Sequence, residues 1–144
     1  MRKSIQLCAV AVLLAGLAYA GDEIKVKTQL KVVNGEFNLT RDSGSKAFDQ
    51  TGNSADYRVL TVGTSVALVS VATDVSTNGW AWFKNSTTTA GHYIDIGPSN
   101  SAAFSPFVRL QPTEFAMFRL HPTNNIHTQA ASNATLLEVW INED

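Results

Sequence analysis

The chain has 144 residues, 44% of them hydrophobic, and its formal net charge is -1. This length fits one domain that can bury a core without disulfides or metals. A near-neutral charge supplies no basic stripe, so nucleic acid is not an expected partner, and a membrane contact is expected only through an uncleaved N-terminal segment.

Residues 1–20 have the pattern of a secretory signal peptide. Arg2 and Lys3 precede an apolar stretch over residues 7–17, and Ala18-Tyr19-Ala20 has the small-x-small form of a cleavage site. The apolar stretch is shorter than the roughly 20 residues of a membrane span. We therefore predict a signal peptide, with an uncleaved N-terminal helix as the alternative, followed by a β-sandwich domain over residues 21–144.

Cleavage after Ala20 has two consequences for the mature chain. It removes Cys8, which lies at the start of the apolar stretch and not at the position of a lipoprotein cysteine. It also leaves an exported protein without disulfides, located in the periplasm, outside the cell or in a virion, that depends on its core for stability.

The first predicted element is a hairpin. Residues 24–33 alternate, with Ile24, Val26, Leu30 and Val32 on one face and mostly lysines on the other. Asn34-Gly35 predicts a type I′ turn, in which both central residues have positive φ. The second strand then begins near Phe37.

The rest of the chain consists of short β-branched and aromatic runs separated by turn residues. A polar loop is predicted over residues 41–56, and extended segments over residues 57–62, 65–71, 80–85, 92–96, 104–110, 115–120, 126–130 and 136–142. In all, about nine short strands predict an all-β protein, an antiparallel β-sandwich of jelly-roll-like form.

Groups that could carry catalysis are few. His92, His121 and His127 fall in separate segments, without the spacing of a zinc site, and no nucleophile or phosphate-binding motif is present. The predicted loop contains three acidic residues that could bind calcium, Asp42, Asp49 and Asp56. Their spacing does not match an EF-hand, and solvated loop acids are the simpler interpretation. We therefore expect no metal, no cofactor and no enzymatic activity.

Three aromatic residues are candidates for a ligand platform. Trp80 and Trp82 share one face of a predicted strand, with Ala81 and Phe83 on the other, and Tyr93 begins the next strand. An exposed aromatic face of a sandwich can stack on a sugar ring. The alternative, which we expect, is that the tryptophans pack between the two sheets, because a mature chain without disulfides needs its largest apolar groups inside.

Three stretches carry a family resemblance, namely residues 28–35, residues 79–85 with 93–97, and residues 110–120 with 137–144. The central pair has the form G-x-x-x-x-K-N … Y-x-x-x-G, and the third stretch has the form L-x-x-x-E-x-x-x-F-x-L before an acidic end. In this order they resemble small β-rich proteins encoded among the structural genes of tailed bacteriophages. The resemblance implies a virion-associated or tail-associated structural protein and brings no catalytic residues.

Two functions follow as hypotheses. The first is a noncatalytic structural or interaction module of a phage particle or extracellular surface assembly, with copies of itself or other assembly proteins as partners. The alternative is an exported carbohydrate-binding β-sandwich module. A secreted enzyme is the least supported, because the sequence contains no recognisable nucleophile, base or metal constellation.

Overall fold

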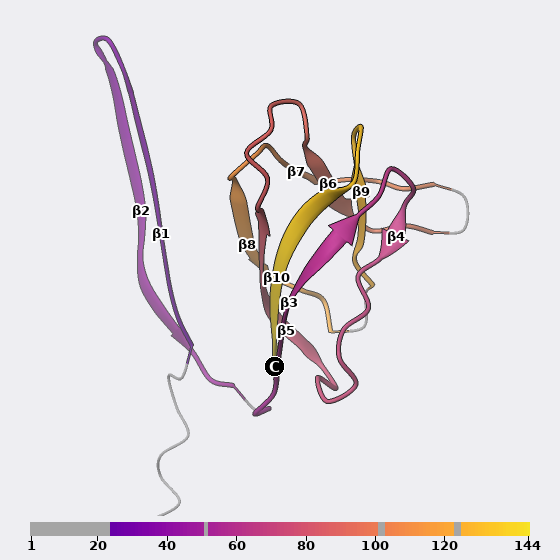
Figure 1. Cartoon of the computed structure of the whole chain (residues 1–144). Helices are drawn as coiled ribbons and strands as arrows, with labels where there is room; N and C mark the ends of the chain where they lie inside the picture. The colour runs from indigo at the N-terminus through magenta and orange to yellow at the C-terminus, as the bar shows by residue number, and fades with distance from the viewer. Residues whose placement is uncertain (1–23, 51, 101–102, 123–124) are drawn as a thin grey trace, which may run out of the picture. The chain divides into compact units, whose positions relative to one another are not determined.

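The computed structural model describes residues 24–50, 52–100, 103–122 and 125–144 (Figure 1). The predicted signal peptide and Cys8 lie outside these ranges. Within them the chain forms ten strands in three antiparallel sheets, which confirms the all-β prediction. No helix in these ranges is long and apolar enough to cross a membrane.

The first sheet is a two-stranded hairpin of β1 (Ile24–Asn34) and β2 (Phe37–Phe48). Strand β2 occupies the first half of the segment predicted as a loop, because β1 offers it a partner along its whole length. The pairing shifts between Lys27 and Gln29, where β2 holds one extra residue. Gly44 takes φ 65° at this bulge, and the Thr28 amide donates to Ser43 Oγ at 2.9 Å.

The hairpin turn is one residue later than the sequence predicted. Asn34 pairs with Phe37, so the two central turn residues are Gly35 and Glu36, and only Gly35 has a positive φ, 56°. The type I′ prediction for Asn34-Gly35 was therefore wrong, and the turn has the glycine-first pattern of type II′. Shifting the turn avoids a left-handed conformation at a residue with a side chain, which only glycine adopts without cost.

The remaining eight strands form a sandwich of two sheets. They are β3 (Ala55–Val62), β4 (Ala67–Leu68), β5 (Asn78–Asn85), β6 (Ile94–Gly97), β7 (Val108–Leu110), β8 (Phe115–Arg119), β9 (His127–Ala130) and β10 (Thr135–Glu143). One sheet has the order β3-β10-β5-β8 and the other β4-β9-β6-β7. Numbered within the sandwich these orders are 1-8-3-6 and 2-7-4-5, which is the jelly-roll arrangement of two Greek keys.

The sandwich is shorter than the predicted domain of residues 21–144. Strands β1 and β2 pair with each other and form one compact unit of the chain, and the sandwich forms another that begins at residue 51. The eight sandwich strands already complete a jelly roll. The alternating pattern of residues 24–33 predicted β1, which pairs with β2 in a sheet of its own.

The core fills the space between the two sandwich sheets. Its fully buried side chains come from alternate positions of the strands, among them Phe83 of β5, Ile94 and Ile96 of β6, and Leu137, Val139 and Ile141 of β10. The ring of Phe83 stacks on that of Phe118 at 5.4 Å between centroids. Gly97, at the end of β6, lies against the backbone of the segment that precedes β7. A Cβ added to Gly97 would meet the Ser105 carbonyl oxygen at 2.3 Å.

Asn85 is a buried polar residue at the end of β5. Its amide nitrogen donates to the carbonyl oxygens of His92, at 2.7 Å, and Leu110, at 3.1 Å. Its side-chain oxygen accepts from the Thr87 amide at 3.1 Å, and its own backbone bonds the turn before β8. Asn85 therefore connects the β5–β6 loop with the β7–β8 turn at one end of the sandwich, which gives the Asn of the sequence motif a structural role.

Candidate binding surface

The outer face of the β3-β10-β5-β8 sheet carries a concentration of apolar side chains. We call this surface the outer face. The register of the four strands places on it the side chains of Tyr57, Val59, Trp80, Trp82, Phe115, Met117, Leu136 and Trp140. Five of the eight are among the most exposed large hydrophobic residues of the described chain, with Phe115 66% exposed and Trp140 36%. Soluble proteins seldom leave so many large apolar groups together on one sheet face.

The centre of the outer face is a row of three aromatic residues and one methionine across the four strands. Trp140 lies opposite Tyr57 on one side and Trp82 on the other, and Trp82 lies opposite Met117. Phe115 stacks beside Trp82, with 6.3 Å between ring centroids. Directly opposed residues of antiparallel strands have Cβ atoms about 4.5–5.5 Å apart, so these side chains form a continuous surface.

The charged groups of the outer face are paired with its own polar groups. The Tyr57 hydroxyl donates to Glu138 Oε1 at 2.9 Å, and Lys84 Nζ lies 3.8 Å from the other carboxylate oxygen. The hydrogen bond to the Glu138 carboxylate raises the pKa of Tyr57. At the edge, the Arg119 guanidinium binds the Asp144 carboxylate. These charged groups of the outer face are thus engaged with neighbouring polar groups.

The expectation that Trp80 and Trp82 pack between the sheets was wrong. Both are partly exposed on the outer face, and their neighbours Ala81 and Phe83 are fully buried in the core. All four residues are apolar, so the sequence could not say which alternate pair faced inward. On the core side of this sheet, Phe83 stacks on Phe118 from the neighbouring strand.

Tyr93 does not join the tryptophans. It precedes β6, in the other sheet of the sandwich, and its ring lies under the Arg109 guanidinium at 3.9 Å from the ring centroid. Arg109 in turn forms a bidentate bond with Asp95, at 2.8 and 2.9 Å, which raises the pKa of the guanidinium. Tyr93 is therefore part of a stacked ion pair, and the predicted three-residue platform is reduced to Trp80 and Trp82.

The residues that sequence reasoning missed are Tyr57, Phe115 and Trp140. Trp140 had a readable signal, because in residues 136–142 the aliphatic residues Leu137, Val139 and Ile141 alternate with Leu136, Glu138 and Trp140. The face that contains Glu138 is the one expected in water. Tyr57 and Phe115 had no such signal, because only strand pairing brings them beside Trp140 and Trp82.

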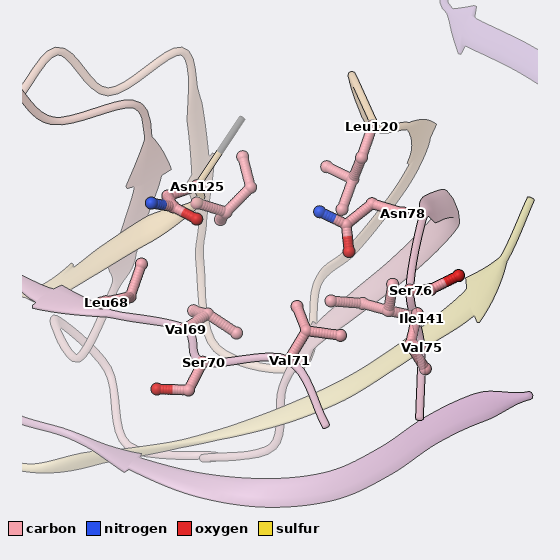
Figure 2. Close-up of a pocket in the computed structure, with 11 residues that line it drawn as sticks. Leu68, Val69, Ser70, Val71, Val75, Ser76, Asn78, Leu120, Asn125 and Ile141 are labelled. Carbon is pink, nitrogen blue, oxygen red and sulfur yellow. The ribbon is translucent and has the colours of Figure 1, made fainter. Parts of the chain in front are cut away.

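The sandwich also contains a cavity of about 330 Å³ between its sheets (Figure 2). Its wall is mostly aliphatic, with Val69, Val71 and Ile141, and includes the amides of Asn78 and Asn125. None of the described residues that line it is charged. This volume is at the lower limit for small-molecule pockets, and the lining supplies no general base or nucleophile.

The histidines and loop acids predicted as weak metal candidates are separated. Among the described residues no group of three or more His, Cys, Asp or Glu side chains could hold a metal ion. Asp42 lies in the hairpin, where the Gly44 amide and the Gln29 and Lys27 side chains lower its pKa. Asp56 is buried in β3, where it accepts from the Ala72 amide and pairs with Arg58.

Comparison with known proteins gives no relative for this chain: no protein-family model, no curated protein and no solved structure matches it.

Proposed function

We propose that this protein is a noncatalytic structural module that assembles with copies of itself through the outer face, in a phage particle or an extracellular surface assembly. The observation that carries the proposal is the group of exposed aromatic side chains of Trp82, Phe115 and Trp140 on the β3-β10-β5-β8 sheet, beside the ion pair of Lys84 and Glu138. Large aromatic groups surrounded by other apolar side chains are the typical centre of a protein–protein interface.

The fold and the sequence resemblance support the same function. Jelly rolls occur in viral capsid and lectin domains, so the fold alone suits both an assembly protein and a sugar-binding protein. The resemblance to phage structural proteins favours the first. It covers the hairpin, the β5–β6 region and β8 with β10, and it carries no catalytic residues.

A carbohydrate-binding module is the second candidate, and the exposed aromatic row favours it. Tryptophan and tyrosine faces stack on sugar rings, and Trp82 and Trp140 lie side by side across two strands. A sugar site also needs polar groups that can bind hydroxyls. On the outer face Glu138 is already engaged by Tyr57 and Lys84, and the exposed side chains of Val59 and Leu136 add aliphatic surface to the aromatic residues, which suits a protein partner better.

Self-association can be measured with one matched pair of variants. Phe115→Gln removes an outer-face ring that is 66% exposed, whereas Phe107→Gln removes a ring that is 58% exposed and lies just before β7 in the other sheet. We expect sedimentation equilibrium of the purified protein to give a mass above that of one chain. Phe115→Gln should weaken association at least about tenfold, and Phe107→Gln should leave it unchanged.

Two results would contradict this function. Purified protein that stays monomeric at high micromolar concentration would remove the basis for self-assembly. Selective binding to a glycan array that Phe115→Gln or Trp82→Ala abolishes, with the fold intact, would favour the carbohydrate-binding module.

A further inference from the structure

The hairpin unit has an apolar face of its own. This hairpin face consists mainly of Ile24, Val26, Leu30 and Val32 from β1 with Phe37, Leu39 and Phe48 from β2, and the register also places on it Lys46, opposite Val26, and Arg41, opposite Leu30. The other side carries Lys25, Lys27 and Lys31. Leu30 is 57% exposed and Phe37 is 58% exposed within the described chain.

A two-stranded ribbon is at best marginally stable in water, and it needs packing of its apolar side for independent stability. Among the described residues, β1 and β2, of 11 and 12 residues, form a sheet without a third strand. The hairpin therefore needs a surface that is apolar and at least as broad as a ribbon. The outer face, four strands wide, has both properties.

The charges of the two units are opposite in sign. Residues 24–50 contain five Lys and Arg against three Asp and Glu, whereas residues 51–144 contain four against seven. A contact between two hairpins brings together two units of net positive charge. A contact between a hairpin and a sandwich brings together a positive and a negative unit. Complementary charge of this kind favours the mixed contact and speeds its formation.

The length of the hairpin favours a partner in another copy. At about 3.3 Å per residue, the 12 residues of β2 span about 40 Å, whereas the nine residues of β10, the longest strand of the outer face, span about 30 Å. A ribbon that exceeds the length of the sheet it covers is suited to bridging from one molecule to the next. When each molecule binds the next through two different surfaces, the copies form a reciprocal dimer, a closed ring or an open filament.

We infer that the hairpin face of one molecule packs on the outer face of a second copy of the same chain. This inference rests on the proposed function, since it names the partner that the outer face binds. It predicts that association depends on one side of the hairpin only, the side that carries Leu30.

The test uses the full chain and two residues on opposite sides of β1. Leu30→Gln alters the hairpin face, and Val33→Gln, the control, alters the lysine side at a residue of similar exposure, 61%. We expect Leu30→Gln to weaken association in sedimentation at least about tenfold and Val33→Gln to change it less than about twofold. If Phe115→Gln weakens association and Leu30→Gln does not, the outer face remains an assembly surface and the hairpin is not its partner. If neither variant weakens it, the inference and the proposed function both fail.

A cross-linking experiment identifies the partner directly. A photoreactive benzoylphenylalanine placed at position 30 is activated in an equal mixture of ¹⁴N-labelled and ¹⁵N-labelled protein, and the cross-linked peptides are identified by mass spectrometry. We expect pairs of mixed isotope that join position 30 to β5, β8 or β10, and no such pairs from position 33. Pairs of a single isotope would mean that position 30 contacts its own chain, and pairs that join two hairpins would mean a different interface; either result overturns the inference.

Discussion

Asn85 shows how one polar residue holds two connections of the sandwich together, the β5–β6 loop and the β7–β8 turn. It is fully buried and makes side-chain hydrogen bonds to the backbone of Thr87, His92 and Leu110. A buried amide of this kind is costly to remove, because its backbone partners lose their hydrogen bonds and stay away from water.

We predict that Asn85→Leu lowers the free energy of unfolding by about 2–4 kcal/mol, since it leaves up to three backbone groups without a partner. Asn133→Ala is the control, because the Asn133 side chain is exposed. The Thr135 hydroxyl donates to the backbone carbonyl oxygen of Asn133, which the substitution keeps. Urea denaturation measures both. Equal stability of the two variants would show that the loops are held by other contacts.

Glu143 makes the stability of the sandwich dependent on pH. The Ser76 hydroxyl, followed by the amides of Ser76, Asn53 and Ser54, lowers the pKa of Glu143 below its ordinary value of 4.5. A carboxyl group with a lower pKa in the folded state contributes stability above its unfolded pKa and loses it as the pH falls through the folded value.

We therefore expect the stability to fall on acidification below about pH 4.5, and Glu143→Gln to reduce this dependence. Urea midpoints measured at a series of pH values give the two curves. Glu36→Gln, in the exposed hairpin turn, is the control and should leave the curve unchanged. Parallel curves for the wild type and Glu143→Gln would mean that Glu143 does not contribute.

At the scale of the element, β5 separates core from surface within four residues. Phe83 and Ala81 point into the core, and Trp80 and Trp82 point to the outer face. The two sides of this strand should therefore respond differently to truncation.

We predict that Phe83→Ala costs about 3–5 kcal/mol of unfolding free energy, as in other large-to-small core changes, and Trp82→Ala less than about half of that. Removal of the fully buried Phe83 ring leaves a cavity in the core, whereas the space of the partly exposed Trp82 ring can be filled by water. Chemical denaturation at low protein concentration keeps self-association out of the comparison. A larger loss for Trp82→Ala would return Trp82 to the core.

The hairpin turn gives a second prediction at this scale. Gly35→Val places a β-branched residue at φ 56°, which costs about 1–3 kcal/mol. The hairpin is a separate unit, so we expect faster hydrogen exchange of the β1 and β2 amides and an unchanged sandwich. Gly63→Val is the control, because Gly63 lacks a positive φ and an added Cβ would meet no atom within 4 Å. Unchanged exchange in the Gly35 variant would contradict the glycine-first turn.

At the scale of the molecule, the described residues form two units, a two-stranded hairpin and a jelly-roll sandwich. The buried hydrophobic core, from Val62 to Ile141, lies wholly within the sandwich unit. The hairpin therefore adds a surface and not a part of the core.

We predict that a protein of residues 51–144 folds by itself and, in dilute solution, unfolds within about 1 kcal/mol of the full chain. Beginning at residue 51 keeps the Asn53 amide that donates to Glu143. Circular dichroism during thermal and urea unfolding measures this. A shortened protein that fails to fold would show that the hairpin supports the sandwich.

The sequence by itself determined the strands and the class of fold. Period-two alternation marked β1, and turn residues separated the short strands, because alternation and turn chemistry are local properties of the backbone. The jelly-roll-like sandwich followed from the number and shortness of these strands. The glycine at the hairpin turn was identified, but its place within the turn depended on the cross-strand register.

Only the tertiary structure decided which face of each strand is inside. In residues 80–83 every side chain is apolar, so alternation gives two equivalent answers, and the packing of Phe83 on Phe118 selects one. Tyr57, Phe115 and Trp140 are far apart in the sequence and meet through strand pairing. A surface built across four strands is a property of the register, which no single segment of the chain contains.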